Sequence, residues 1–201
     1  MAARASSEII ECMLILASAS PRRRDLLAQA GYEFRTSVAN IDESVHAGEN
    51  PIAYVVRLAR EKAEAVHAAE GKSALVLGAD TAVVAPNGEI LGKPQSDQDA
   101  ARMLRLLAGA THTVVTGVAL VQPGFVETAA EVTYVTMRTL SDAEINAYVQ
   151  SGEPRDKAGA YAIQGYAARW IPRIHGCYFN VVGLPLALVT AMIEGMEVKG
   201  G

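Results

Sequence analysis

Cysteine is scarce in this chain, whose 201 residues include only Cys12 and Cys177. Neither belongs to a Cys-x-x-Cys pair or has a histidine nearby at ligand spacing, so the sequence indicates neither a disulfide framework nor a zinc site. No serine has the flanking glycines of a nucleophile elbow, which argues against a covalent serine mechanism. Metal-ligand spacing is also missing among the four histidines, which are His46, His67, His112 and His175. The cysteine usage favours a cytoplasmic protein.

Positive charge is also in deficit, with 18 lysines and arginines against 22 acidic residues and a net charge of -4. A nucleic-acid binder usually carries a large basic face, so no nucleic-acid polymer is expected as partner and phosphate binding must be local. No segment approaches ~20 uninterrupted apolar residues, so no membrane span is expected. Residues 1–12 are expected to be a short polar extension, because they lack the apolar run of a signal peptide. Residues 13–201 are expected to form a single domain.

Apolar runs, helical periodicity and turn signals alternate along the chain. Helices that alternate with strands, together with a hairpin, predict an α/β fold with a mixed central β-sheet flanked by helices. Gly71 is expected to end the second helix, and Asp80 to end the second buried strand. The predicted strands are 13–17, 74–77 with an end at 78–81, a resumed strand pattern at 83–84 before a turn at 86–88, a hairpin over 111–137, 160–163 and 178–182. The predicted helices are 21–30, 51–69, 97–108, one from a capping box at 141–144 to 151–152, and one after Pro185.

One helix start carries an unusual charge. Ser20 and Pro21 favour a helix beginning there, since serine caps free N–H groups and proline suits the first position. Acidic residues normally occupy a first turn, yet here Arg22, Arg23 and Arg24 crowd it. A phosphate would satisfy these cations and the free N–H groups together. The alternative from this stretch alone is an ordinary capped helix with solvated arginines.

Two acidic and two basic residues elsewhere are candidates for the same site. Asp80 would face the arginine turn if its strand and 13–17 are parallel neighbours, and could bind a divalent ion or orient a water molecule. A turn aspartate that bonds its own backbone is the alternative. The alternative for Lys62 is a surface ion pair, and the alternative for Glu43 is a solvated carboxylate in a loop. Lys93 lies between a glycine and a proline, as in a binding loop.

Five segments, taken in order, resemble the Maf family of nucleotide pyrophosphatases. The resemblance runs from about residue 13 to residue 192, and five motifs in this order are highly specific although each alone is common. The segments are LASASPRR at 16–23, LAREKA at 58–63, GADT at 78–81, GKP at 92–94 and DKAGAYAIQG at 156–165.

The resemblance implies a Maf or inosine triphosphate pyrophosphatase-like fold with a cleft between two lobes. It also implies a cytoplasmic, homodimeric hydrolase that cleaves a nucleoside triphosphate to monophosphate and pyrophosphate with a divalent cation, Mg, Mn or Co. Asp80 is then expected to activate water and, with Glu43, to bind the metal. The phosphates are expected to be held by Ser18, Ser20, Arg23, Lys62 and Lys93.

Three further positions bear on the substrate. Arg22, Thr81 and Gln164 match the branch of the family that acts on dTTP and UTP, and the amide of Gln164 can pair with a base edge. The expected substrates are therefore dTTP and UTP, with modified pyrimidine triphosphates as related candidates, in a nucleotide-pool cleaning role. The alternatives are a pyrophosphatase of 7-methyl-GTP or of non-canonical purine nucleotides, and a regulatory nucleotide-binding protein that affects septum formation.

Overall fold

A computed structural model describes residues 13–70 and 74–199. The expected polar extension at 1–12 and the helix end at Gly71 lie outside these ranges. The described residues contain a seven-stranded sheet in the order β2-β1-β3-β5-β6-β7, with β4 paired to β3. The strands are β1 (Leu14–Ala17), β2 (Phe34–Thr36), β3 (Leu75–Val84), β4 (Ile90–Leu91), β5 (Thr111–Gln122), β6 (Phe125–Thr136) and β7 (Arg173–His175).

Six α-helices and three short 3-10 helices surround this sheet within the same described ranges. The mixed α/β class is confirmed, because β1 is parallel to β2 and β3 whereas β3, β5, β6 and β7 pair antiparallel. The helices are α1 (Pro21–Gln29), α2 (Pro51–Glu70), α3 (Asp97–Leu107), α4 (Asp142–Gln150), α5 (Tyr178–Val182), α6 (Leu186–Lys199), η1 (Glu153–Asp156), η2 (Ala158–Ala160) and η3 (Tyr166–Trp170).

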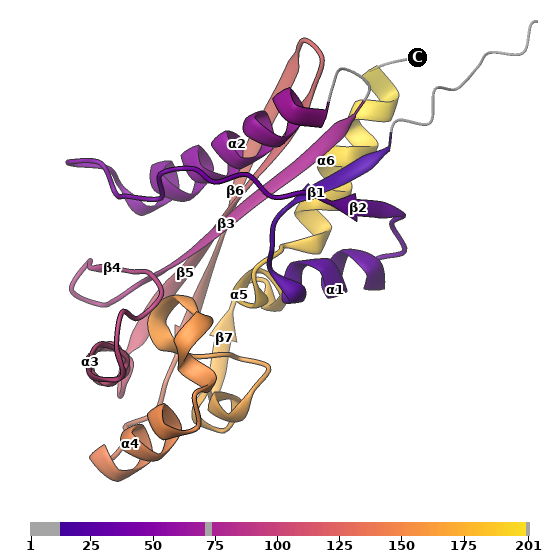
Figure 1. Cartoon of the computed structure of the whole chain (residues 1–201). Coiled ribbons are helices and arrows are strands. Elements are labelled where there is room, and N and C mark those ends of the chain that lie inside the picture. Colours follow the sequence, from indigo (N-terminus) through magenta and orange to yellow (C-terminus); the bar gives the residue numbers. More distant parts are fainter. Residues whose placement is uncertain (1–12, 71–73, 200–201) are drawn as a thin grey trace, which may run out of the picture.

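The two faces of the sheet belong to different apolar cores. Along β1, Leu14 and Leu16 join a core with α1, α3, α4 and α6, whereas Ile15 and Ala17 join a core with α2. This alternation confirms a strand buried on both faces. Figure 1 shows α2 on one side of the long strands, α1 and α6 on the other, and α3 and α4 near one end. No helix among residues 13–70 and 74–199 is long and apolar enough to cross a bilayer.

Helix α2 lies unusually close to the sheet. A Cβ atom built on Gly78 of β3 would lie 2.0 Å from the carbonyl oxygen of Ala59, and one on Gly117 of β5 would lie 2.6 Å from the amide nitrogen of Val56. Only glycine lets the helix backbone approach the strands this closely. Lys62 lies three residues after Ala59 on α2, and its ammonium reaches Asp80 in the middle of β3.

Strand β3 corrects the predicted position of Asp80. Asp80 does not end the strand: β3 continues unbroken to Val84 because β5 pairs along it, with Asp80 opposite Gly117. Strand β1 ends at Ala17, which pairs with Gly78. Asp80 therefore lies two residues beyond the end of β1, where β1 turns into α1. Strands β1 and β3 are parallel neighbours, so the condition under which Asp80 would face the arginine turn is met.

Two other predicted strands are wrong. Residues 160–163 form no strand, because η2 ends at Ala160, which has a positive φ of 59°. Residues 178–182 form helix α5. Both segments are apolar because they pack into the core, not because they pair in the sheet. Strands β2, β4 and β7 were not predicted, since two or three residues give too short a pattern. The β5–β6 hairpin and the capping box of Ser141 and Glu144 are confirmed.

Candidate active site

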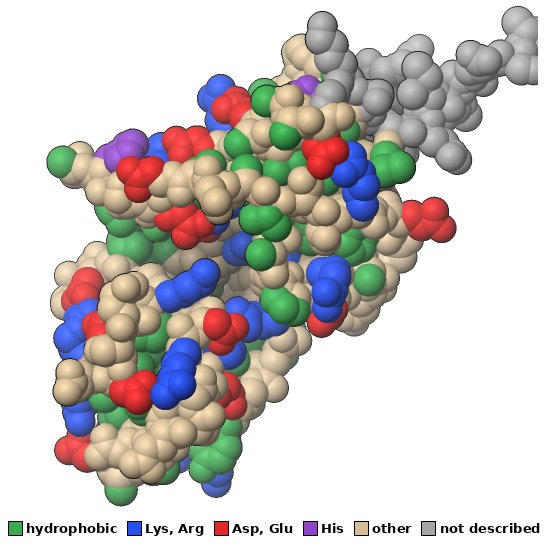
Figure 2. Space-filling model, in the orientation of Figure 1, with side chains coloured by type: hydrophobic (Ala, Val, Ile, Leu, Met, Phe, Trp, Pro, Cys, Tyr) green, Lys and Arg blue, Asp and Glu red, His purple; other side chains and the backbone are tan. Residues whose placement is uncertain are grey.

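A cavity of about 400 Å³ lies where the start of α1, helix α2 and strand β3 face the segments 156–164 and 181–183. Figure 2 shows the surface hollowed there, with Lys and Arg side chains on its walls. Nine of the ten site residues predicted from the sequence line this cavity. The tenth, Ser18, is buried beside it. The expected cleft is thus present, and it gathers residues from segments far apart in the sequence.

The predicted anion turn keeps hydrogen-bond donors that a ligand could use. Ser20 caps α1, its hydroxyl accepting a hydrogen bond from the Arg23 amide at 3.4 Å. The hydroxyl of Ser18 accepts from the Ser20 amide at 3.2 Å and from Arg23 Nη1 at 3.3 Å. No acidic residue occupies the first turn of α1. With both lone pairs used, the Ser18 hydroxyl keeps its O–H for a ligand.

Arg23 forms the inner wall of the cavity. Its Nε donates to the Gly183 carbonyl at 2.8 Å and its Nη2 to the Thr81 hydroxyl at 3.0 Å. Burial lowers the pKa of Arg23 despite the opposing charge of Asp80. Thr81 also lies 2.9 Å from the Thr116 hydroxyl. Thr81 therefore holds Arg23 in place. The guanidinium has five N–H groups, of which three donate to Gly183, Ser18 and Thr81, so within the described residues two remain for a ligand.

Lys62 joins the two predicted metal-binding carboxylates. Its ammonium lies 2.6 Å from Asp80 Oδ1 and 2.7 Å from Glu43 Oε1. The side chains of Lys62 and Asp80 are only 14% and 12% exposed, whereas Glu43 is 52% exposed. Burial raises the pKa of Glu43, but the hydrogen bond and charge of Lys62, with the charges of Lys93 and Arg23, outweigh it and lower the pKa overall. Lys62 thus keeps Glu43 ionised beside Asp80.

The loop that carries Glu43 is held by contacts that sequence reasoning missed. Arg57 of α2 lies 2.6 Å from a carboxylate oxygen of Glu49 and donates to the Ser44 carbonyl at 2.9 Å. The hydroxyl of Tyr54 donates to the Glu43 carbonyl, also at 2.9 Å. Hydrogen bonding to Arg57 lowers the pKa of Glu49 to about 2. Arg57 had the sequence pattern of an exposed polar helix position, so nothing local indicated this role.

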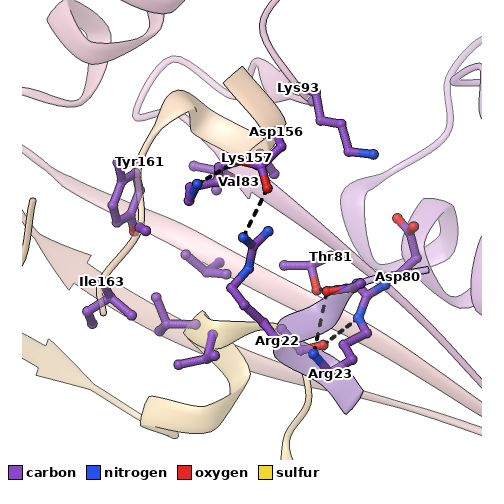
Figure 3. Close-up of a pocket in the computed structure, with 18 of the residues that line it drawn as sticks. Arg22, Arg23, Asp80, Thr81, Val83, Lys93, Asp156, Lys157, Tyr161 and Ile163 are labelled. Carbon is purple, nitrogen blue, oxygen red and sulfur yellow. Dashed lines mark hydrogen bonds and ion pairs between the residues drawn. The ribbon is translucent and has the colours of Figure 1, made fainter. Parts of the chain in front are cut away.

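Lys93 supplies a further cation at the mouth of the cavity. It is exposed on the loop after β4 and points toward the site (Figure 3). Within the residues that the structure describes, no hydrogen bond or ion pair of its ammonium is present. Its charge nevertheless contributes to lowering the pKa of Glu43. Lys93 is thus free to bind an anion that enters the cavity.

The opposite wall comes from the segment after α4. Asp156 lies 3.2 Å from Arg22 Nη1 and 2.6 Å from Lys157 Nζ. Gln164 is exposed at the cavity rim. The sequence marked 156–159 and 163–165 only as weak binding-loop patterns. Their role became visible when the fold joined Asp156 to Arg22 across 134 residues.

The cavity has one charged and one apolar end. Figure 3 places Tyr161 and Ile163 on one side of Arg22, and Asp80 and Lys93 on the other. Val83, Val114 and Val182 also belong to the apolar lining. The hydroxyl of Tyr161 lies 2.8 Å from Nε2 of buried His112. A ligand with a polyanionic part and a flat heterocycle would match both ends.

The carboxylates suit a metal ion that shares its ligands with a substrate. No group of three or more histidine, cysteine or acidic side chains able to hold an ion occurs within residues 13–70 and 74–199. Glu43 and Asp80 are drawn together by Lys62. Mg²⁺ is typically bound by one or two carboxylates with water and phosphate oxygens. The residues therefore fit such an ion in company with a phosphate ligand, not in an all-protein cage.

Known proteins match this chain along most of its length. The family model described as Maf-like protein matches residues 13–196. A dTTP/UTP pyrophosphatase of Moorella thermoacetica is 54% identical over 193 residues, covering 93% of this chain and 97% of that protein. A dTTP/UTP pyrophosphatase of Koribacter versatilis is 53% identical over 181 residues, covering 90% and 93%.

Solved structures support the fold. The Staphylococcus aureus Ham1 protein aligns with a TM-score of 0.51 at 16% identity, over 92% of this chain and 99% of that one. At this identity the likeness concerns the fold alone. The family model and the close relatives go further, because the family model matches residues 13–196, a range that holds the five segments that meet in the cavity, and the relatives cover 90% or more of this chain. This chain belongs to the Maf family.

Proposed function

We propose that this protein is a nucleoside triphosphate pyrophosphatase, a hydrolase that converts dTTP and UTP to the monophosphate and pyrophosphate. The observation that carries the proposal is the meeting of Asp80, Lys62 and Glu43 beside the arginine-rich start of α1. Relatives at about half sequence identity are named for this activity. Modified pyrimidine triphosphates, a cytoplasmic location, a homodimer and nucleotide-pool cleaning stay predictions.

The charged end of the cavity would bind the triphosphate. The N–H groups at the start of α1 and the O–H groups of Ser18 and Ser20 provide neutral donors. Arg23 offers its remaining N–H groups, and Lys93 approaches from the mouth. Since charge develops on the phosphate oxygens as the anhydride bond breaks, fixed cations around them stabilise the transition state.

Asp80 would accept a proton from the attacking water. Its Oδ1 accepts a hydrogen bond from Lys62 at 2.6 Å, which fixes the orientation of the carboxylate, and among the described residues no hydrogen bond to Oδ2 is present. The exposed Glu43 faces it across the same ammonium. A divalent cation bound by Asp80 and Glu43, Mg, Mn or Co, would supply charge neutralisation for the phosphates.

Selectivity would come from the rim and the apolar end. The amide of Gln164 can donate to and accept from a pyrimidine edge. Arg22 is held toward the segment of Gln164 by Asp156. Thr81 would act indirectly, since its hydroxyl is bonded to Arg23 and Thr116. All three positions line one cavity. Gln164 and Arg22 would contact the substrate directly, whereas Thr81 would act through Arg23.

The test is a panel of purified triphosphates with Mg²⁺ or Mn²⁺, scored for pyrophosphate, in the wild type and in Asp80→Asn. We expect dTTP and UTP to lead, and the variant to lose roughly 10²- to 10⁴-fold in kcat while it still binds a non-hydrolysable triphosphate, because asparagine cannot accept the proton. Asp25→Asn is the matched control, as Asp25 is an exposed aspartate paired with Arg24.

Other outcomes would favour the alternatives. A tenfold preference for 7-methyl-GTP, ITP or XTP over dTTP and UTP would contradict the pyrimidine assignment. Near-wild-type turnover by Asp80→Asn would contradict its role as base. Tight nucleotide binding without any pyrophosphate release by the wild type would favour the regulatory nucleotide-binding protein.

A further inference from the structure

The carboxylate of Glu153 lies beneath the turn that carries Gln164. Its Oε1 accepts hydrogen bonds from the hydroxyl of Tyr148 at 2.9 Å and from the amide of Tyr166 at 3.1 Å. A Cβ atom built on Gly165 would lie 2.7 Å from the carboxyl carbon of Glu153. Gly165 has a negative φ of -99°, so a side chain here is opposed by lack of space and not by the backbone angles, and a methyl group would force the turn and the Glu153 carboxylate apart. The turn therefore packs directly on the carboxylate.

Tyr148 holds the other end of the same turn. Its hydroxyl accepts from the amide of Ala162 at 3.3 Å while donating to Glu153. Burial, and then the hydrogen bond to Glu153, raise the pKa of Tyr148, so the hydroxyl keeps its proton. The Tyr148 ring is fixed by an edge contact with Trp170 at 5.0 Å between centroids. Residues 162 and 166, on either side of Gln164, are thus tied to one hydrogen-bonded pair, the buried Tyr148 and the partly buried Glu153.

The backbone of Glu153 reaches the second residue of the specificity set. Its carbonyl accepts from Lys157 Nζ at 2.6 Å, and the same ammonium lies 2.6 Å from Asp156. Asp156 in turn holds Arg22. The two groups proposed to select the nucleotide are therefore supported from a single short segment, η1.

We propose that Glu153 is a positioning residue for nucleotide selectivity, which fixes the orientation of Gln164 without touching the substrate. Neither Glu153 nor Tyr148 lines the cavity. The inference rests on the proposed function, in which Gln164 reads the base. The charged end of the cavity comes from α1, α2, β3 and the loops that carry Glu43 and Lys93, so loss of the Glu153 carboxylate should loosen base recognition and leave phosphate binding intact.

Four variants test this positioning role. Glu153→Ala removes the acceptor, and Gly165→Ala forces the turn and the carboxylate apart. Glu153→Gln keeps an oxygen that can accept the hydrogen bonds from the Tyr148 hydroxyl and the Tyr166 amide. Arg155→Ala is the matched control, because Arg155 lies on the same short helix in an exposed ion pair with Asp97. The measured quantity is the ratio of kcat/KM for UTP to kcat/KM for CTP. CTP is the comparison because cytosine carries a donor where uracil carries an acceptor, and an acceptor where uracil carries a donor. Inorganic tripolyphosphate, as a competitive inhibitor, measures phosphate binding without a base.

We expect Glu153→Ala and Gly165→Ala to lower the UTP-to-CTP ratio roughly tenfold or more, because a misplaced amide no longer penalises the wrong edge. Inhibition by tripolyphosphate should stay within about twofold of wild type, and Glu153→Gln and Arg155→Ala should keep the wild-type ratio. The double variant Glu153→Ala/Gly165→Ala should be less than additive, since removal of the carboxylate makes room for the new methyl group.

The inference is wrong if Gln164→Ala lowers the ratio while folded Glu153→Ala and Gly165→Ala do not. It is also wrong if both variants weaken tripolyphosphate as much as UTP, since the effect would then be a general loss of structure. An unchanged ratio in Gln164→Ala would refute base reading by Gln164, and the positioning role with it. Should the wild type turn over no triphosphate, the proposed function fails, and the ratio of UTP to CTP binding constants decides the inference instead.

Discussion

Gly78 is the point where the backbone of α2 comes closest to the sheet, and Gly78→Ala tests whether that approach sets the position of Lys62. The added Cβ would lie 2.0 Å from the Ala59 carbonyl oxygen, and an ordinary contact begins near 3.4 Å. Helix and strand would therefore have to separate by about 1.4 Å along that direction. A backbone carbonyl cannot rotate away as a side chain can, so the helix itself must move.

The expected cost has two parts. Overpacking of this kind destabilises by about 1–3 kcal/mol, which for a chain of this length lowers the melting temperature by roughly 2–12 °C. Lys62 follows Ala59 on the displaced helix, and its hydrogen bond to Asp80 is only 2.6 Å long. Misplacement by about 1 Å can reduce turnover roughly 10²-fold, so we expect a kcat loss of about tenfold to a hundredfold.

The assay combines thermal unfolding with steady-state pyrophosphate release from UTP below the melting temperature. Gly195→Ala is the control, because Gly195 is helical and a Cβ there meets nothing within 4 Å. That variant should keep its kcat and gain up to about 1 kcal/mol of stability. Wild-type stability and turnover in Gly78→Ala would refute the argument. Lost stability with unchanged kcat would refute its second half, the link from helix position to Lys62.

Two further perturbations address the buried histidine and the loop of Glu43. Burial lowers the pKa of His112 to about 4. As pH falls below 6.5, His112 is therefore protonated in the unfolded chain but not in the folded one, and the free energy of unfolding decreases. His112→Gln should therefore lose about 2 kcal/mol less unfolding free energy than wild type between pH 7 and 5 in urea titrations; equal losses would contradict this. Arg57→Ala should raise the Mg²⁺ concentration for half-maximal activity roughly tenfold by freeing the loop. Arg60→Ala, which removes an exposed ion pair on the same helix, should not; equal effects of the two substitutions would contradict the loop argument.

The sequence predicted those features that depend on neighbouring residues. Ser20 with Pro21 predicted the start of α1, and the capping box of Ser141 and Glu144 predicted the start of α4. Continuous apolar character predicted β1, and alternation predicted the β5–β6 hairpin. Motif order predicted which residues meet, since nine of the ten line one cavity.

The tertiary structure decided what depends on residues far apart in the chain. Asp80 lies inside a strand because β5 pairs alongside it, and no local pattern reports the length of that pairing. Segments 160–163 and 178–182 are apolar because they pack in the core, a pattern that a buried strand shares. The contacts Arg57–Glu49, Arg22–Asp156 and Glu153–Tyr166 likewise join charged or polar groups whose partners are chosen by packing. Residue types and their order thus determined the chemistry of this site, whereas long-range packing determined which of these groups are held rigidly enough to perform it.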